Sequence, residues 1–232
     1  MTQRKIQYWV IPPKENAQFA ADMENVLQTY KRPYDKRFPV ICMDEQPVQL
    51  LEEVNIPIAA TKNHARRADY EYKRAGTVSI FMFCEPLAGW RDVVVRSRRT
   101  KIDWAIEMRR ILNEHYAKAE KVTLVCDNLN THVTGSFYDA FVANEARSLL
   151  DRFEFCYTPK HGSWLNVAEN ELSSMTRQSM HGHRFATIES IQSQVSAWAS
   201  ATNMKQRGVD WQFTIDDARQ KLKHLYPKIK SG

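Results

Sequence analysis

The sequence predicts an α/β protein whose helices cover a mixed β-sheet. Two short apolar runs, PVICMDE at 39–45 and KVTLVCDN at 121–128, have the length and composition of buried strands. Between them, GTVSIFMFCEPLAGWRDVVVRSR is typical of a hairpin, because two strand-like runs flank a Pro-Leu-Ala-Gly turn. The hairpin requires an antiparallel pair, and helical patterns separate the other strands. We therefore expect both strand directions in one sheet.

The predicted elements alternate along the whole chain. Residues 15–30 place apolar side chains at helical spacing, and Pro33 then stops the pattern. We expect further helices at 102–116, about 136–152, about 164–180, about 187–202 and about 215–225. We expect strands at 39–45, 78–83, 92–95, 121–128 and 153–159. No glycine-rich loop matches the phosphate-binding patterns GxxxxGKS/T or GxGxxG, which disfavours nucleotide hydrolysis by such a loop.

The bulk properties favour one soluble domain that binds a polyanion. A chain of 232 residues is at the usual upper size of a single domain. No stretch approaches the roughly 18 to 20 apolar residues that span a bilayer, and the start lacks the apolar run of a signal peptide. The net charge of +6 favours a polyanionic partner. Basic residues cluster at 62–74, 96–101 and 219–230, although a solvated surface explains each cluster equally well.

The cysteines are interpreted as small buried side chains in a reducing compartment rather than as metal ligands. They stand far apart, each inside an apolar run and without a CxxC pair. They are Cys42, Cys84, Cys126 and Cys156.

Three acidic residues are candidates for metal-dependent chemistry. Asp44 and Asp127 each close an apolar strand, and Glu169 follows in a helical segment. Hard divalent cations need clustered carboxylate oxygens, and two ions about 3.5 to 4 Å apart can support in-line attack on a phosphodiester. The spacings of 83 and 42 residues (127 − 44 and 169 − 127) mean that the fold must bring the three together. The alternative for a strand-end Asp is a helix cap or a turn.

Three segments around these acids carry a resemblance to a known family. VICMDEQPVQLL, LVCDNLNTH and YTPKHGSWLNVAENELSSMTRQ resemble the active-site blocks of the insertion sequence 630 transposases, bacterial relatives of the Tc/mariner transposases. The likeness extends from about residue 8 to 227. It implies that Asp44, Asp127 and Glu169 are the catalytic and metal-binding DDE triad. It also implies a ribonuclease-H-like fold, in which helices flank a five-stranded mixed sheet.

The same resemblance implies the activity, cofactor and partners. The expected cofactor is Mg²⁺ or Mn²⁺, and the expected reaction is two-metal-ion cleavage of double-stranded DNA at inverted-repeat ends, followed by strand transfer into a TA target. Because two ends must be paired, we expect a homodimer on DNA. Family members commonly carry helix-turn-helix domains before the catalytic core, so a separate helix-turn-helix product could supply end recognition. We expect a cytoplasmic, nucleoid-associated protein of bacterial or archaeal origin.

The resemblance also suggests how the chain is divided. We expect an amino-terminal extension with a helix at 1–38, the ribonuclease-H-like DDE catalytic domain at 39–185, and carboxy-terminal helices packed on the same domain at 186–232. Two alternatives remain open for the function. One is a ribonuclease-H-like nuclease that cuts without joining, and the other is a non-catalytic DNA-binding or regulatory remnant of a transposase.

Residues near the triad are candidate DNA contacts. Side chains and free N–H groups at the start of the Glu169 helix can meet a phosphate; those side chains are Lys160, His161, Trp164 and Asn166. A core role is more common for the Trp. Arg177 lies about two turns after Glu169 and so on the same helix face, where a phosphate contact and an ordinary surface position are equally plausible. The cluster at 96–101 adds Arg98 and Arg99.

Three further residues are assigned with less direct support. His132 follows the second Asp and could orient a phosphate or the leaving group, an assignment that depends on the family block. Glu45 should point to the opposite face from Asp44, and we expect it to be a solvated charge. Glu171 lies roughly opposite Glu169 on the helix, and Glu169 is the expected ligand mainly because the family resemblance places the acid directly after WLNVA.

Overall fold

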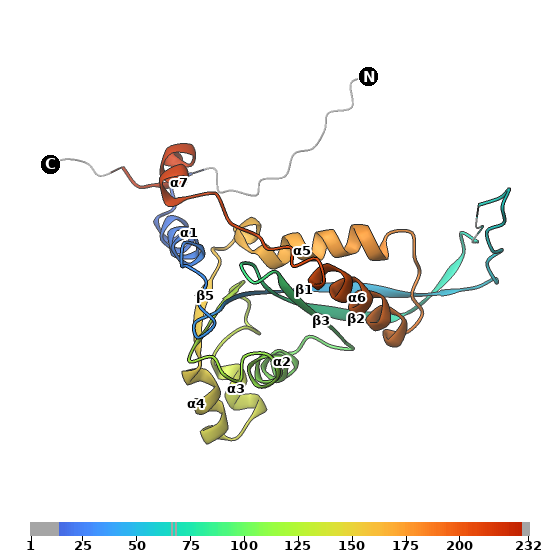
Figure 1. Ribbon diagram of the computed structural model, residues 1–232, viewed down its shortest axis with the longest axis horizontal. Helices are drawn as coiled ribbons and strands as arrows, with labels where there is room; N and C mark the ends of the chain where they lie inside the picture. Colours follow the sequence, from blue (N-terminus) through green and yellow to red (C-terminus); the bar gives the residue numbers. More distant parts are fainter. Residues whose placement is uncertain (1–13, 66, 68, 229–232) are drawn as a thin grey trace.

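A mixed five-stranded sheet forms the centre of the molecule (Figure 1). The computed structural model describes residues 14–65, 67 and 69–228. The strands lie in the order β3-β2-β1-β4-β5, with β1 antiparallel to β2, β2 antiparallel to β3, and both β1–β4 and β4–β5 parallel. Their bounds are Val40–Glu53 (β1), Tyr72–Glu85 (β2), Trp90–Arg96 (β3), Val122–Cys126 (β4) and Phe153–Tyr157 (β5). The predicted mixed sheet and its hairpin at the Pro-Leu-Ala-Gly turn are confirmed.

Strand β1 is longer than its apolar run predicts. It continues to Glu53 and pairs with β2 from Cys42↔Cys84 to Glu53↔Tyr72, so the expectation that the strand ends near Asp44 is wrong. Pro47 and the mixed polarity of the later residues obscured this extension. Beyond the short pairing with β4, which ends at Cys42↔Val125, no other strand of the described residues pairs with this edge of β1, and proline is tolerated where no ladder hydrogen bond is needed. The β1–β2 arm extends away from the body (Figure 1).

Helices cover both faces of the sheet. One face is covered by α1 (Ala17–Tyr30), α5 (Val167–Met175), α6 (Ile188–Asn203) and α7 (Ile215–Lys221), whose buried side chains share one core cluster. The other is covered by α2 (Lys101–Glu114), α3 (Gly135–Ala140) and α4 (Ala143–Asp151). Alternate side chains of β2 enter the two clusters, with Met82 in the first and Phe81 and Phe83 in the second. Burial on both faces explains the continuous apolar runs of the sequence.

Two predicted helices are interrupted. The helix expected at about 136–152 is two helices, because Phe141 adopts an extended conformation (φ −134°, ψ 159°) and packs its ring beneath the Arg109 guanidinium at 4.6 Å. The segment expected as a helix at about 164–180 begins with a 3-10 turn at Ser163–Leu165 and ends in a π-helical turn at Thr176–Met180. Only its central part is an α-helix.

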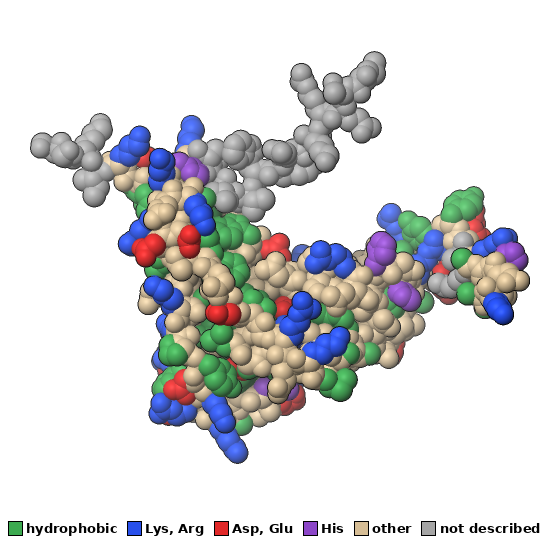
Figure 2. Space-filling model, turned by 45° about the horizontal axis from the view of Figure 1, so that its top comes forward, with side chains coloured by type: hydrophobic (Ala, Val, Ile, Leu, Met, Phe, Trp, Pro, Cys, Tyr) green, Lys and Arg blue, Asp and Glu red, His purple; other side chains and the backbone are tan. Residues whose placement is uncertain are grey.

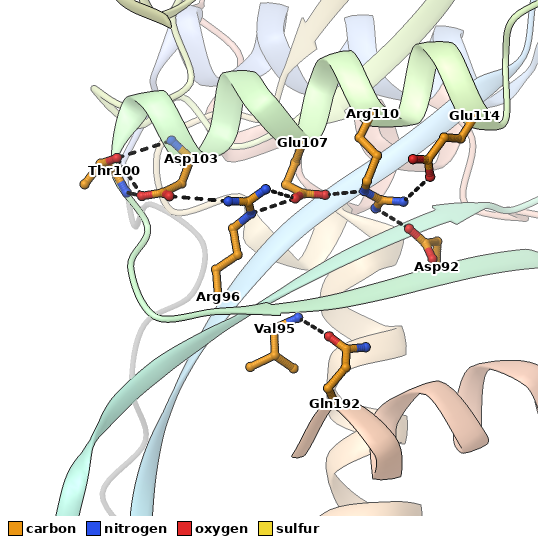
Figure 3. Close-up of polar contacts among 9 residues, drawn as sticks. All are labelled: Asp92, Val95, Arg96, Thr100, Asp103, Glu107, Arg110, Glu114 and Gln192. Carbon is orange, nitrogen blue, oxygen red and sulfur yellow. Dashed lines mark hydrogen bonds and ion pairs between the residues drawn. The ribbon is translucent and has the colours of Figure 1, made fainter. Parts of the chain in front are cut away.

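The edge strand β3 is held on both sides (Figure 3). On the α2 side, the buried Glu107 carboxylate accepts hydrogen bonds from Arg96 Nε and Arg110 Nε, each at 2.6 Å. On the α6 side, Val95 N–H donates to Gln192 Oε1 at 2.7 Å, and Gln192 Nε2 donates to the Val93 carbonyl at 3.0 Å. A side chain thus satisfies backbone groups on the open edge, which would otherwise be free to pair with another chain.

The outer segments pack on the same body as the sheet. Met23 of α1, Val195 of α6 and Ala218 of α7 belong to one buried cluster. The boundaries after residues 38 and 185 stay a prediction, and residues 1–13 and 229–232 of the outer segments lie outside the described residues. All four cysteines are buried and unbridged. Within the ranges that the structure describes, no helix is long and apolar enough to cross a membrane.

Candidate active site

The parallel pairing of β1 and β4 brings Asp44 and Asp127 to equivalent positions on neighbouring strands, just beyond the last paired residues. Cys42 pairs with Val125, and each Asp lies two residues further along its strand direction. Two residues along a strand return the side chain to the same face. Glu169 lies in the first turn of α5 and lines the same pocket, of about 470 Å³, as the two Asp. Three acids that are distant in sequence therefore share one cleft.

Asn166 fixes the start of α5 against β1. As the N-cap, it accepts a hydrogen bond from Ala168 N–H at 3.1 Å and donates through Nδ2 to the Met43 carbonyl at 2.9 Å. That carbonyl belongs to the residue before Asp44. The Asn166 cap thus positions Glu169 relative to Asp44. Asn166 itself is only 1% exposed, which leaves almost none of its surface for DNA. This placement argues against the phosphate contact predicted for Asn166.

The three carboxylates are close enough to influence one another. The pKa of Asp44 is raised to about 7, mainly by burial and further by the charges of Asp127 and Glu169, while the Glu45 backbone N–H donates at 2.7 Å and acts in the opposite direction. A buried carboxylate beside two others is unfavourable unless a cation compensates it. In the described residues, neither Asp44 nor Glu169 forms an ion pair with a basic side chain.

The donor set fits a hard divalent cation in its chemistry. Carboxylate oxygens are the ligands that Mg²⁺ and Mn²⁺ prefer. As the side chains stand, no group of three His, Cys, Asp or Glu among the described residues is close enough together to enclose an ion. The residues therefore provide the right atoms and charge in an open arrangement, and closure around an ion would require side-chain movement.

His132 joins Asp127 to Glu45 beneath the cleft. Its Nδ1 hydrogen-bonds the Asp127 carboxylate, and its Nε2 lies 3.1 Å from Glu45 Oε1. The side chains of His132 and Glu45 are 1% and 3% exposed, and Trp104 stacks on the imidazole with ring centroids 5.3 Å apart. Burial lowers the pKa of His132, but the two carboxylates outweigh it and raise the pKa to about 9. A protonated imidazole can donate to both carboxylates.

This arrangement corrects one expectation and narrows another. Glu45 does point to the opposite face from Asp44, but the prediction that it is solvated is wrong, because that face is covered by Trp104 and His132. His132 has no exposed surface, so its position argues against a direct contact with DNA and favours the orientation of Asp127. The pairing spans 87 residues, and no local pattern could have revealed it.

A comparison with known protein families assigns the chain to one of them. A family profile described as "DDE superfamily endonuclease" matches residues 39–192, which include all three acids of the cleft. The chain belongs to the DDE superfamily of endonucleases. No protein of curated function matches it closely enough to refine this assignment.

Solved structures of the Mos1 mariner transposase share the fold of this DDE domain. The paired-end complex with Mn has 14% sequence identity and a TM-score of 0.55, over 96% of this chain and 65% of that chain. The pre-cleavage transpososome has 14% identity and a TM-score of 0.57, over 99% and 68%. At this level of sequence identity the likeness concerns the fold alone, and it confirms the predicted ribonuclease-H-like fold. The chain spans just under two thirds of the Mos1 chain in the paired-end complex.

The other predicted DNA contacts of the DDE domain differ in exposure. Lys160 and His161 are exposed and line a hollow of about 700 Å³ together with Asp127. His161 has a left-handed backbone (φ 65°), which is unusual outside glycine. Arg177 is exposed in the pocket of the three acids. Trp164 is partly buried with its ring 5.8 Å from that of Phe213, the packing position that is more common for Trp.

Arg98 and Arg99 lie in the exposed loop between β3 and α2. The last residue of β3, Arg96, pairs with Ser79, which also pairs with Pro47 of β1. The loop therefore leaves the sheet beyond the level of Asp44 and leads to α2, on the opposite face from α5, and neither Arg98 nor Arg99 lines the pocket of the three acids.

A buried ion pair distinguishes the two glutamates of α5. Arg91 donates from Nε to Glu171 Oε2 at 3.0 Å and from Nη2 to Oε1 at 2.6 Å, and both side chains are nearly fully buried. Glu171 is thereby tied to β3, whereas Glu169 is exposed in the cleft. The expectation that Glu169 faces the site rather than Glu171 agrees with these positions. The Arg91 partnership was not apparent from the sequence.

Proposed function

We propose that the chain is the catalytic domain of a DNA transposase of the insertion sequence 630 group, which cuts DNA and joins it to a target. The main support is the cleft in which Asp44, Asp127 and Glu169 lie together, with the pKa of Asp44 raised to about 7 in their company. Membership of the DDE superfamily supports the endonuclease step. The joining step and the narrower family rest on the sequence blocks around these acids.

Each acid has a role in this proposal. Asp44 and Asp127, at adjacent parallel strands, would share the metal ions, and Glu169 would complete the second site. Two Mg²⁺ or Mn²⁺ ions held there would activate the attacking oxygen and stabilise the leaving oxygen during in-line displacement. His132 would hold the Asp127 carboxylate in one orientation from below. Asn166 would hold the helix that carries Glu169.

The proposed partner is double-stranded DNA. Lys160, His161 and Arg177 are exposed around the carboxylates and would contact phosphates. Arg98 and Arg99, in the exposed loop before α2, would add contacts further from the cleft. Mos1 has been solved in a paired-end complex, and by analogy we propose a homodimer on DNA for this chain. In this proposal a separate helix-turn-helix part recognises the inverted repeats. The target is a TA dinucleotide, and the protein is cytoplasmic and associated with the nucleoid.

The products on plasmid DNA test this function. The assay uses a supercoiled TA-rich plasmid and pre-nicked candidate ends, with Mg²⁺, Mn²⁺ or EDTA. The wild type is compared with Asp127→Asn and with Asp139→Asn, an exposed Asp on α3 that serves as the matched control. Metal-dependent joined products that are lost only in Asp127→Asn are expected. Cleaved but unjoined DNA would indicate a nuclease, and binding without cleavage in either metal would indicate a regulatory protein.

A further inference from the structure

A second hollow adjoins the carboxylate cleft. It measures about 350 Å³ and shares Arg177 with that cleft. Its walls come from β3, α5, the π-helical turn that follows α5, α6 and the loop that follows α6. The charged residues that line it are Arg91, Glu171, Arg177, Lys205 and Arg207. Nothing in the chemistry of the three acids requires this second hollow.

The charge of this hollow is uncompensated. The only acid that lines it, Glu171, already accepts hydrogen bonds from Nε and Nη2 of the buried Arg91. The third guanidinium nitrogen of Arg91, Nη1, is buried without a hydrogen-bond partner. Arg177, Lys205 and Arg207 are exposed, and none of them forms an ion pair within the described part of the chain. Three positive charges therefore face one hollow without an acid to neutralise them. Such a surface attracts anions and can raise their rate of association.

The loop that carries Lys205 and Arg207 is fixed to the sheet. The Asn203 side chain accepts from Arg91 N–H at 2.8 Å and donates to the Arg91 carbonyl at 2.8 Å. Val209 N–H donates to the Pro86 carbonyl at 2.8 Å. The loop also passes so close to the β2–β3 turn that a Cβ at Gly89 would lie 2.9 Å from the Gln206 carbonyl carbon. Because the backbone that carries the two cations is already held, less conformational entropy is lost when the loop binds a ligand.

We propose that Arg177, Lys205 and Arg207 bind successive backbone phosphates of duplex DNA that extends from the carboxylate cleft. This inference rests on the proposed function, because it takes the DNA held at the cleft as its starting point. The cations occupy two neighbouring hollows with Arg177 between them, an arrangement that suits a chain of phosphates better than a single small anion. Figure 2 shows Lys and Arg side chains gathered near the middle of the face that it presents.

The salt dependence of DNA binding tests this site. Affinity for a blunt DNA duplex is measured in EDTA at several salt concentrations, so that cleavage plays no part. Loss of one phosphate contact lowers the slope of log K against log salt by about 0.9. We expect that decrease for Lys205→Ala and for Arg207→Ala, and about 1.8 for the double variant if the contacts are independent. Lys118→Ala is the control, because Lys118 is exposed in the loop that enters β4, at the far end of that strand from Asp127.

The outcomes separate this site from the proposed function. Unchanged slopes in both single variants, or a slope reduced equally by Lys118→Ala, would overturn the site even if the wild type cleaves DNA. A wild type without salt-dependent DNA binding would overturn it as well. Reduced slopes in a protein that never cleaves would support the site and contradict the transposase function. Because both side chains are exposed, the variants should unfold at the wild-type temperature, which is checked in parallel.

Discussion

His132 and Glu45 form a buried contact, with Nε2 of the imidazole 3.1 Å from the carboxylate of a residue that directly follows Asp44. The other ring nitrogen contacts Asp127, so one side chain links the strands that carry two of the three candidate metal ligands. A buried charge that loses its partner is strongly unfavourable. The contact therefore affects both the stability of the fold and the geometry of the cleft.

His132→Ala is expected to destabilise the protein by about 3 to 5 kcal/mol, because it leaves Glu45 buried without a partner. Adding Glu45→Gln removes that charge and should restore part of the loss. The free energy of unfolding is measured by urea titration. The affinity for Mn²⁺ separates positioning from stability, since it should stay low in the double variant, where Asp127 is still unrestrained. Full recovery of Mn²⁺ affinity in the double variant would contradict the positioning role.

Asp44→Asn is expected to stabilise the metal-free protein above pH 7. The folded pKa of Asp44 is about 7 and the unfolded value is about 3.8, so the folded state binds the proton more tightly. The carboxylate therefore carries no penalty below about pH 4, a growing penalty from pH 4 to 7, and the full penalty above that range. The gain in Asp44→Asn should be of the order of 4 kcal/mol at high pH and vanish near pH 4. Urea unfolding in EDTA at several pH values measures it, and a pH-independent difference would contradict it.

Glu169→Gln and Glu171→Gln should have opposite effects, although the residues are two positions apart on α5. Glu171 pairs with buried Arg91, so Glu171→Gln should cost about 3 to 5 kcal/mol of stability. Glu169 is exposed, so Glu169→Gln should change stability by less than about 0.5 kcal/mol while abolishing DNA cleavage. Thermal unfolding and a cleavage assay on both variants check this. Equal destabilisation by the two changes would contradict the assigned roles.

Gly89→Ala should destabilise the fold, and Gly135→Ala should not. Gly89 has φ +66°, and an added Cβ would lie 2.9 Å from the backbone of Gln206. A strained position of this kind costs about 1 to 3 kcal/mol. Gly135 begins α3 and has open space around it, so Ala there should be neutral or stabilise by about 0.4 to 1 kcal/mol. Unfolding midpoints of the two variants give the comparison, and a neutral Gly89→Ala would show that the loop after α6 is not held against the turn.

The sequence was most informative where structure depends on local pattern. Apolar runs that end in Asp identified β4 and the start of β1, because burial on both faces leaves a continuous run of apolar side chains. The later part of β1 was missed because its partner residues at the start of β2 are exposed and polar. The break at Phe141 was missed because tertiary packing of its ring, rather than a local helix-breaking residue, ends α3 there.

The cleft likewise combines residues that the sequence identified with tertiary contacts that it could not reveal. Position at the end of an apolar run singled out Asp44 and Asp127, and the family resemblance favoured Glu169 over Glu171. The partners that hold them could not be found in this way, since Asn166 to Met43 spans 123 residues and Glu45 to His132 spans 87. Glu45 was expected to be solvated because nothing near it in the sequence indicates that Trp104 and His132 cover its face.

The most direct test of the account is Mn²⁺ binding by the DNA-bound protein, measured by electron paramagnetic resonance. Asp44→Asn, Asp127→Asn and Glu169→Gln are compared with the wild type and with Asp139→Asn. The account predicts that each of the three cleft variants binds Mn²⁺ at least about tenfold more weakly, a cost of about 1.4 kcal/mol or more, and that Asp139→Asn binds like the wild type. Unchanged Mn²⁺ affinity in the cleft variants would contradict the assignment of these carboxylates as the metal site.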